Sequence, residues 1–143
     1  MDKGIRSNSS SDGYAWKVSP IEIVIGTNIT TIGADAFSGM QLLEKVSIAE
    51  SVTTIEDNAF ILCVNLKDVL LSNGLKKIGY ESFRDINGYA EMTIPVTVDE
   101  IGAGAFEDCT YGKITFAGRT LDQVEAMANY PWGAESSIIA ELS

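Results

Sequence analysis

The side chains that most often do chemistry in proteins are sparse in this sequence. It has two cysteines, Cys63 and Cys109, and no histidine. Without histidine the usual general base near neutral pH is missing. Neither a Cys–His nucleophile nor a Cys/His zinc site can form. The residue types therefore argue against the commonest kinds of catalytic and metal centre.

The remaining polar pairs fit solvated turns better than active sites. The carboxylate pairs Glu56-Asp57 and Asp99-Glu100 lie where the chain is expected to turn. Gly102 and Gly104 do not make a dinucleotide-binding loop, because no strand–helix–strand unit surrounds them. Asp57-Asn58 lacks the oxygen ligands of a calcium loop. We expect no enzyme activity, no metal and no cofactor.

Length and charge narrow the remaining functions. The 143 residues suffice for one domain with a core, and the formal net charge is −10. That charge argues against nucleic acid, which calls for a basic surface, and against anionic membranes. No apolar run is long enough to span a bilayer, so no membrane insertion is expected. Residues 1–12 do not resemble a secretory signal, so any signal peptide would lie outside this sequence.

The elements that position any functional side chain come from an internal repeat. The pattern Ile-x-x-x-x-Phe recurs every 23 residues, at Ile32 to Phe37, Ile55 to Phe60, Ile78 to Phe83 and Ile101 to Phe106. Other apolar columns keep the same spacing: Ile29, Val52, Leu75, Val98; Ala36, Ala59, Ser82, Ala105; Met40, Cys63, Ile86, Cys109; and Leu43, Leu66, Tyr89. Alternating pairs precede them: Ile23/Ile25, Val46/Ile48, Val69/Leu71, Met92/Ile94 and Ile114/Phe116.

A period of 23 residues lies within the roughly 20–29 residues of leucine-rich repeats. One coil cannot bury its own apolar residues, whereas stacked coils bury each column against its copies. The alternating pairs predict short strands that pair in parallel from coil to coil. The stretch from Gly33 to Gly39 suits a single helical or 3-10 turn, and the four phenylalanines should stack along the core.

These residues resemble the BspA-type leucine-rich repeat. The copy at 46–66 carries the Ser-Val-Thr-x-Ile stretch, the Asn-Ala-Phe turn and the Cys-x-Asn-Leu close of that family. Ala49 and Ser72 depart from the proline common after the strand, whereas Pro95 keeps it. The predicted fold, between α/β and mainly β, is a right-handed leucine-rich-repeat solenoid. It has four 23-residue coils with short parallel strands, and a C-terminal helix–strand cap.

The resemblance implies a class of function rather than a ligand. It points to a cell-surface or secreted bacterial protein with a non-enzymatic role in adhesion or in binding. The partner would be a host or bacterial surface protein or a glycan. The alternative is a structural spacer, or a phage-tail-like display element with no ligand of its own. The family has no shared catalytic residues to carry over.

Four segments are expected along the chain. Residues 1–13 form a flexible arm or a remnant of expression, and residues 14–20 an N-terminal cap with Tyr14, Trp16 and Val18. The alternative for these aromatic residues is an exposed contact site. The repeats occupy 21–116 and the C-terminal cap 117–143.

The C-terminal cap should contain a helix and a final strand. Thr120 to Gln123 has the spacing of a capping box, and Leu121, Val124 and Ala128 would share one helical face. Asn129 and Pro131 should stop the helix, and residues 137–142 read as the final strand. Tyr130, Pro131 and Trp132 either close the end of the core or form an aromatic ligand site.

A ligand would meet the outward residues of the predicted strands. Two outward columns can be read from the repeat: Glu22, Lys45, Asp68, Glu91, Lys113; and Val24, Ser47, Leu70, Thr93, Thr115. The first column mixes charges, so either its neighbours form weak ion pairs or the face is a polar groove for a peptide or glycan. Cys63 and Cys109 lie two coils, or roughly 10 Å, apart, too far for a disulfide. We expect two buried free thiols.

Overall fold

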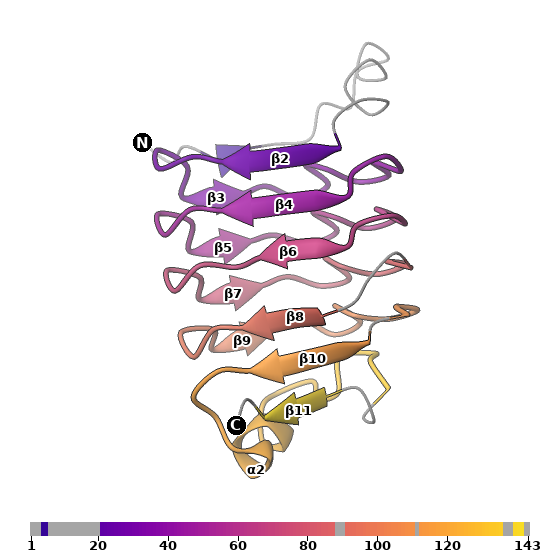
Figure 1. Ribbon diagram of the computed structural model, residues 1–143. Coiled ribbons are helices and arrows are strands. Elements are labelled where there is room, and N and C mark those ends of the chain that lie inside the picture. The colour runs from indigo at the N-terminus through magenta and orange to yellow at the C-terminus, as the bar shows by residue number, and fades with distance from the viewer. Residues whose placement is uncertain (1–3, 6–20, 88–90, 111, 136–138, 142–143) are drawn as a thin grey trace.

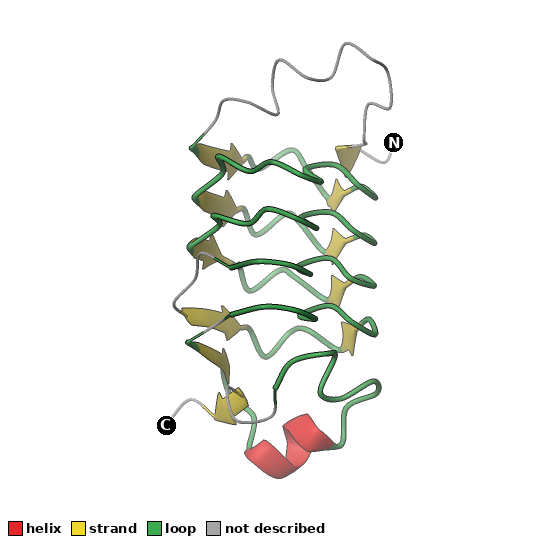
Figure 2. Cartoon of the chain, turned by 90° about the vertical axis from the view of Figure 1, so that its right-hand side faces the viewer, coloured by secondary structure: helices red, strands yellow, loops and turns green. Residues whose placement is uncertain are grey.

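The computed structural model describes residues 4–5, 21–87, 91–110, 112–135 and 139–141. Over these residues the chain winds as a stack of coils with one parallel sheet along each of two sides (Figure 1). Figure 2 shows the two sheets as two columns of strands joined by loops. The predicted solenoid of stacked coils is confirmed.

One sheet is built from the longer strands and is called here the long-strand sheet. Its strands are β2 (Glu22–Ile25), β4 (Lys45–Ile48), β6 (Asp68–Leu70), β8 (Glu91–Ile94), β10 (Lys113–Phe116) and β11 (Ile139–Glu141). The short-strand sheet consists of β1 (Gly4–Ile5), β3 (Thr31–Ile32), β5 (Thr54–Ile55), β7 (Lys77–Ile78) and β9 (Glu100–Ile101). In both sheets, strands of successive coils are neighbours.

The strand register follows the 23-residue period. Ile32 is paired with Ile55, and Ile55 with Ile78. Because each repeat makes one coil, every apolar column is covered by its own copies above and below.

The four repeat phenylalanines form the predicted stack. Ring centroids are 5.2 Å apart between Phe37 and Phe60, 5.3 Å between Phe60 and Phe83, and 6.0 Å between Phe83 and Phe106. Neighbouring rings are within 19° of parallel. At most 6% of any of these side chains is exposed. The stack therefore lies in the core.

The segment around each phenylalanine is a run of turns rather than a regular helix. The N–H groups of Ala36 and Ser38 donate to carbonyls three residues back, as in a 3-10 turn. The N–H groups of Asp35, Phe37 and Gly39 instead donate to the next coil. Alternate donors thus bind the coils together, and a continuous helix cannot form.

The array has about five turns, one more than predicted, because strands at its ends extend the sheets. Strand β1 pairs with β3, although residues 1–13 were expected to be a flexible arm. At the other end β11 pairs with β10. The N-terminal cap predicted for residues 14–20 lies outside the described residues.

The C-terminal cap contains the helix α2 (Leu121–Glu125) at the end of the stack (Figure 1). The predicted capping box of Thr120 and Gln123 is present. The predicted helical face is wrong in part, because only Val124 is buried, whereas Leu121 is 39% exposed. The helix ends at the C-cap Ala126, before the stop expected at Asn129, so Ala128 lies beyond it. Strand β11 lies within the predicted final strand.

The loop between α2 and β11 closes the core. Trp132 is 1% exposed, and its ring packs against those of Phe106 and Phe116. The Trp132 Nε1–H donates to the Ala128 carbonyl at 2.8 Å, and its own carbonyl accepts from the Phe106 N–H. This loop therefore covers Phe106 at the C-terminal end of the stack, where a further coil would otherwise pack.

Candidate interaction surface

The outward face of the long-strand sheet carries both predicted columns. In the strand register, Glu22 is opposite Lys45, Lys45 is opposite Asp68, Asp68 is opposite Glu91, and Glu91 is opposite Lys113. Val24, Ser47 and Leu70 are likewise in register, as are Thr93 and Thr115. Repeat spacing thus located neighbours correctly across the sheet.

Charges in the first column are only partly compensated. Lys45 Nζ lies 3.2 Å from Glu22 Oε1, and both side chains are substantially exposed. Among the described residues, Asp68, Glu91 and Lys113 form no salt bridge. Asp68 and Glu91 are directly opposite across β6 and β8, and like charges in that position repel. The middle of this column therefore has two neighbouring carboxylates that no cation among the described residues contacts, although Lys45 and Lys113 are next to them in register.

The second column is partly apolar and partly inaccessible. Val24 is 71% exposed and Leu70 is 56% exposed. Thr115 is only 7% exposed, so its predicted place on an open ligand face is wrong. Its Oγ1 lies 3.0 Å from Thr93 Oγ1 and 3.4 Å from the Met92 carbonyl oxygen. β10 lies between β8 and β11. The Thr115 hydroxyl therefore contacts the neighbouring strand β8 and is not available to a ligand.

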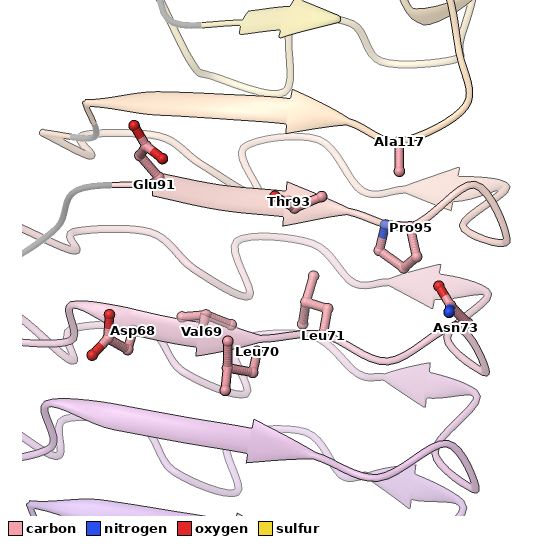
Figure 3. A pocket seen from close by; sticks show the side chains of 9 residues that line it. All are labelled: Asp68, Val69, Leu70, Leu71, Asn73, Glu91, Thr93, Pro95 and Ala117. Carbon is pink, nitrogen blue, oxygen red and sulfur yellow. The ribbon is translucent and has the colours of Figure 1, made fainter. Parts of the chain in front are cut away.

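A groove of about 460 Å³ opens on this face between β6 and β8. It is lined by Asp68, Val69, Leu70, Leu71, Asn73, Glu91, Thr93, Pro95 and Ala117. Figure 3 shows Asp68 and Glu91 at one end of the two strands, and Leu71 and Pro95 towards the other. The groove therefore has a carboxylate end and an apolar end.

The groove lies where the long-strand sheet is least completely paired. β6 and β8 are in register at two positions, Asp68 with Glu91 and Val69 with Met92. β8 and β10, by contrast, are paired over four positions. The ribbons of β6 and β8 also stand further apart than the other neighbours in Figure 1.

Pro95 lacks a backbone donor that two equivalent residues use to bind the neighbouring strand. At the same position in other coils, the Ala49 N–H donates to the Ile25 carbonyl at 3.1 Å, and the Ala117 N–H to the Ile94 carbonyl at 2.9 Å. Proline has no N–H to give the corresponding Leu71 carbonyl. Leu71 is partly exposed, whereas Ile48 and Ile94 in its column are buried. The Ser72 N–H, at the equivalent position one coil back, makes no such bond to the Ile48 carbonyl either, and Ile48 stays buried. The missing bond therefore coincides with the opening at Leu71 and does not by itself produce it.

Sequence reasoning missed the apolar end of the groove. Leu71 belongs to an inward column, and Asn73, Pro95 and Ala117 follow the strands, so outward alternation excludes all four. The signal that could have found them is the single proline among the equivalent positions Ala49, Ser72 and Pro95.

The other carboxylate pairs have structural roles. Glu56 Oε2 accepts from the Ala34 N–H at 2.9 Å, and Asp57 Oδ1 from the Tyr80 N–H at 2.8 Å. Asp99 faces the Arg119 guanidinium at 3.4 Å. These side chains connect successive coils, as expected for turns rather than active sites.

An acidic cluster surrounds Arg84 on the turn side of the stack. Its guanidinium lies within 3.5 Å of carboxylate oxygens of Glu81, Asp85, Glu107 and Asp108. Within the described ranges, no group of three or more acidic, cysteine or histidine residues has a geometry that could hold a metal ion.

The two cysteines are free thiols in different surroundings. Cys63 is buried, and burial raises the pKa of its thiol to about 12. Cys109 is only half-buried, so the expectation that both thiols are buried is wrong for this residue. The Cys63 and Cys109 thiols donate to the carbonyls of Phe37 and Phe83 at 3.1 and 2.8 Å. Both thiols thus satisfy backbone acceptors one coil back.

Among the described residues, no helix has the length and apolar character required to cross a membrane.

Comparisons with known proteins agree on the fold. Residues 10–130 match, in six copies, the family described as BspA type leucine rich repeat region. The leucine-rich repeat protein TpLRR of T. pallidum is similar in structure, with a TM-score of 0.59 and 23% identity over 81% of this chain. This chain spans 58% of the length of TpLRR.

A leucine-rich cell surface protein of Faecalibacterium prausnitzii A2-165 has a TM-score of 0.36 and 19% identity. That match covers 66% of this chain and 38% of the other. A search of curated proteins finds no significant match.

Proposed function

The chain belongs to the BspA-type leucine-rich repeat family, and we propose that its long-strand sheet is a non-enzymatic binding surface for a protein or a glycan. The protein that carries it would be a bacterial surface-exposed or secreted protein. The partner would be a molecule of a host or of another bacterial surface, and binding would serve adhesion.

The observation that carries this proposal is the groove of about 460 Å³ on the outward face. Stacked coils repeat their outward residues at close spacing, so a partner meets one continuous surface rather than separate loops. On this surface Leu70 is 56% exposed, near the carboxylates of Asp68 and Glu91, which form no salt bridge among the described residues. An exposed apolar side chain beside polar groups is typical of an interaction site.

Enzymatic activity has little support. The sequence has no histidine, and burial keeps the Cys63 thiol protonated at neutral pH. The carboxylates Glu56, Asp57 and Asp99 are engaged by backbone N–H groups or by Arg119. A site that binds without transforming its ligand fits these residues better.

A second candidate is a structural spacer or a phage-tail-like display element without a ligand of its own. It is favoured by the composition of the two outward columns, which contain no aromatic residue and no arginine. Those residue types dominate strong binding sites.

The test is binding to a glycan array and to immobilised host extracellular-matrix proteins. Leu70→Glu places a charge in the groove and should reduce binding about tenfold or more, because a hot-spot contact contributes about 2 kcal/mol. Leu42→Glu is the matched control, since Leu42 is 49% exposed and lies outside the strands. Circular dichroism should show both variants folded.

If the wild-type protein is folded but binds neither set, the spacer is the better explanation. Equal loss of binding in both variants would also contradict a site on the long-strand sheet.

A further inference from the structure

We propose that the groove between β6 and β8 binds an extended polypeptide segment that has a lysine or arginine two residues away from an apolar side chain. This inference rests on the proposed binding function and names the chemistry of its ligand. The basic side chain would lie at Asp68 and Glu91, and the apolar side chain beside Leu70, where Leu71 and Pro95 extend the apolar end of the groove.

The carboxylate end selects a cation. Asp68 and Glu91 are opposite one another on neighbouring strands and are both exposed. Two lysines are next to these carboxylates in register but do not contact them: Lys45 forms its salt bridge with Glu22, and Lys113 forms none among the described residues. A guanidinium or ammonium group placed between two such carboxylates gains charge-assisted hydrogen bonds and removes their repulsion. The net charge of −10 also attracts basic segments over acidic ones.

The apolar end selects a hydrophobic side chain. Leu71 is partly exposed because the sheet opens beside it, and Pro95 and Ala117 line the same part of the groove. None of the described residues that line the groove is aromatic, so these residues offer no ring on which a sugar could stack. A peptide therefore fits this lining better than a glycan.

The dimensions favour an extended segment. Strand residues rise about 3.3 Å each, so side chains two residues apart point the same way about 7 Å from one another. That spacing corresponds to the offset along β6 from Asp68 to Leu70. The Leu71 carbonyl, which Pro95 cannot serve, can accept an N–H from the segment.

The first experiment uses an array of synthetic peptides in a Gly/Ser framework. Each carries Lys or Arg two residues from Leu or Phe, in both orders. Matched peptides have Glu or Gln in place of the basic residue, or Ser in place of the apolar one. We expect the basic–apolar peptides to be retained about tenfold better than the Glu peptides, as charge-assisted contacts allow. Their binding should weaken as salt is raised.

Charge variants locate the site. Asp68→Asn combined with Glu91→Gln should remove the preference for Lys and Arg. Glu50→Gln combined with Glu125→Gln is the matched control, because it removes the same charge from two exposed positions outside the groove. The control should keep the preference.

Pro95→Ala tests the opening itself. Alanine occupies the equivalent positions 49 and 117, where its N–H completes the sheet. The variant should therefore fold, protect the new amide at position 95 from hydrogen exchange, and bind the basic–apolar peptides several-fold more weakly. Full binding in a variant whose amide is protected would contradict the role of the opening.

The outcomes separate this inference from the proposed function. If basic–apolar peptides bind no better than Glu peptides, or if both charge variants behave alike, the inference is overturned. If matrix proteins or glycans still bind in a way that Leu70→Glu abolishes, the proposed function survives that failure. Silence in every assay overturns both.

Discussion

The contribution of a single residue to stability depends on the equivalent residues in the neighbouring coils, which pack against it. Ser82 illustrates this, because it stands in a column whose other members are Ala36, Ala59 and Ala105. All four side chains are buried. The Ser82 hydroxyl has no hydrogen-bond partner among the described residues. A buried hydroxyl without a partner loses its hydration and gains nothing in return.

Replacing Ser82 by alanine should therefore stabilise the protein. We expect Ser82→Ala to raise the free energy of unfolding by about 1 kcal/mol, measured by urea denaturation. The reciprocal variant Ala59→Ser puts a hydroxyl into the same column one coil back and should lower that free energy by about 1–2 kcal/mol. A loss of stability in Ser82→Ala would mean that the hydroxyl has a partner after all.

The two thiols should differ in reactivity. The thiolate is the reactive form, and the raised pKa of about 12 keeps Cys63 protonated up to about pH 10. In the Cys109→Ser variant we expect Cys63 to resist a thiol reagent until the protein unfolds. In the Cys63→Ser variant, the half-buried Cys109 should react sooner. Mass spectrometry of labelled protein would measure both rates, and rapid labelling of Cys63 would contradict its burial.

The same pKa shift makes stability depend on pH. The folded-state pKa of Cys63 lies above its ordinary value of 9.0, so above about pH 9 the unfolded chain loses a proton that the folded protein retains. Stability should therefore fall as pH rises from about 9 towards 12. This contribution should be absent in Cys63→Ser.

At the scale of elements, the turns are defined by backbone conformation as much as by burial. Each turn has two residues of positive φ four positions apart, such as Asp35 and Gly39 in the first coil. The second position is occupied in later coils by Leu62, Asp85 and Asp108, with φ between 55° and 61°. At this second position, residues other than glycine thus adopt the left-handed conformation in three of the four turns.

A comparison of Gly39 with Gly26 distinguishes the effect of backbone conformation on stability from the effect of packing. A Cβ added at Gly39 or at Gly26 would meet no atom within 4 Å, but only Gly39 has a positive φ, of 72°. Gly39→Ala should cost about 1–2 kcal/mol of stability because alanine is strained in this region. Gly26→Ala should be neutral or stabilising by up to about 1 kcal/mol. Thermal denaturation of both variants checks this, and equal effects would argue against the conformational cause.

At the scale of the whole molecule, the coils depend on their ends. A solenoid without a closing segment would present the last apolar columns to water. Trp132 closes the C-terminal end against Phe106 and Phe116, and Arg119 donates to the Val96 and Val98 carbonyls of the preceding coil. The cap is therefore part of the cooperative structure rather than an appendage.

Removing the Trp132 ring should destabilise the C-terminal coils first. We expect Trp132→Ala to cost about 3–5 kcal/mol, with amide exchange accelerated in β10 more than in β4. Leu121→Ala, in the same cap but 39% exposed, should change stability by about 0.5 kcal/mol or less. Uniform acceleration in β4 and β10 would indicate that the stack unfolds only as one unit.

The coil, the strand register and the phenylalanine stack follow from the amino-acid sequence alone. They can be predicted because the same pattern recurs every 23 residues. Each column is buried by its own copies, so residues 23 positions apart are expected to be neighbours. Outward alternation likewise suffices to place Asp68 and Glu91 side by side.

Departures from the repeat depend instead on the three-dimensional packing of the chain. Four features depend on neighbours that differ from coil to coil: the burial of Thr115, the partial exposure of Cys109, the salt bridge of Lys45 with Glu22, and the additional strand β1. The groove is the clearest case. The sequence shows that Pro95 has no N–H to donate to the Leu71 carbonyl. The 23-residue period does not predict how far β6 and β8 separate, because that depends on how the two strands pack.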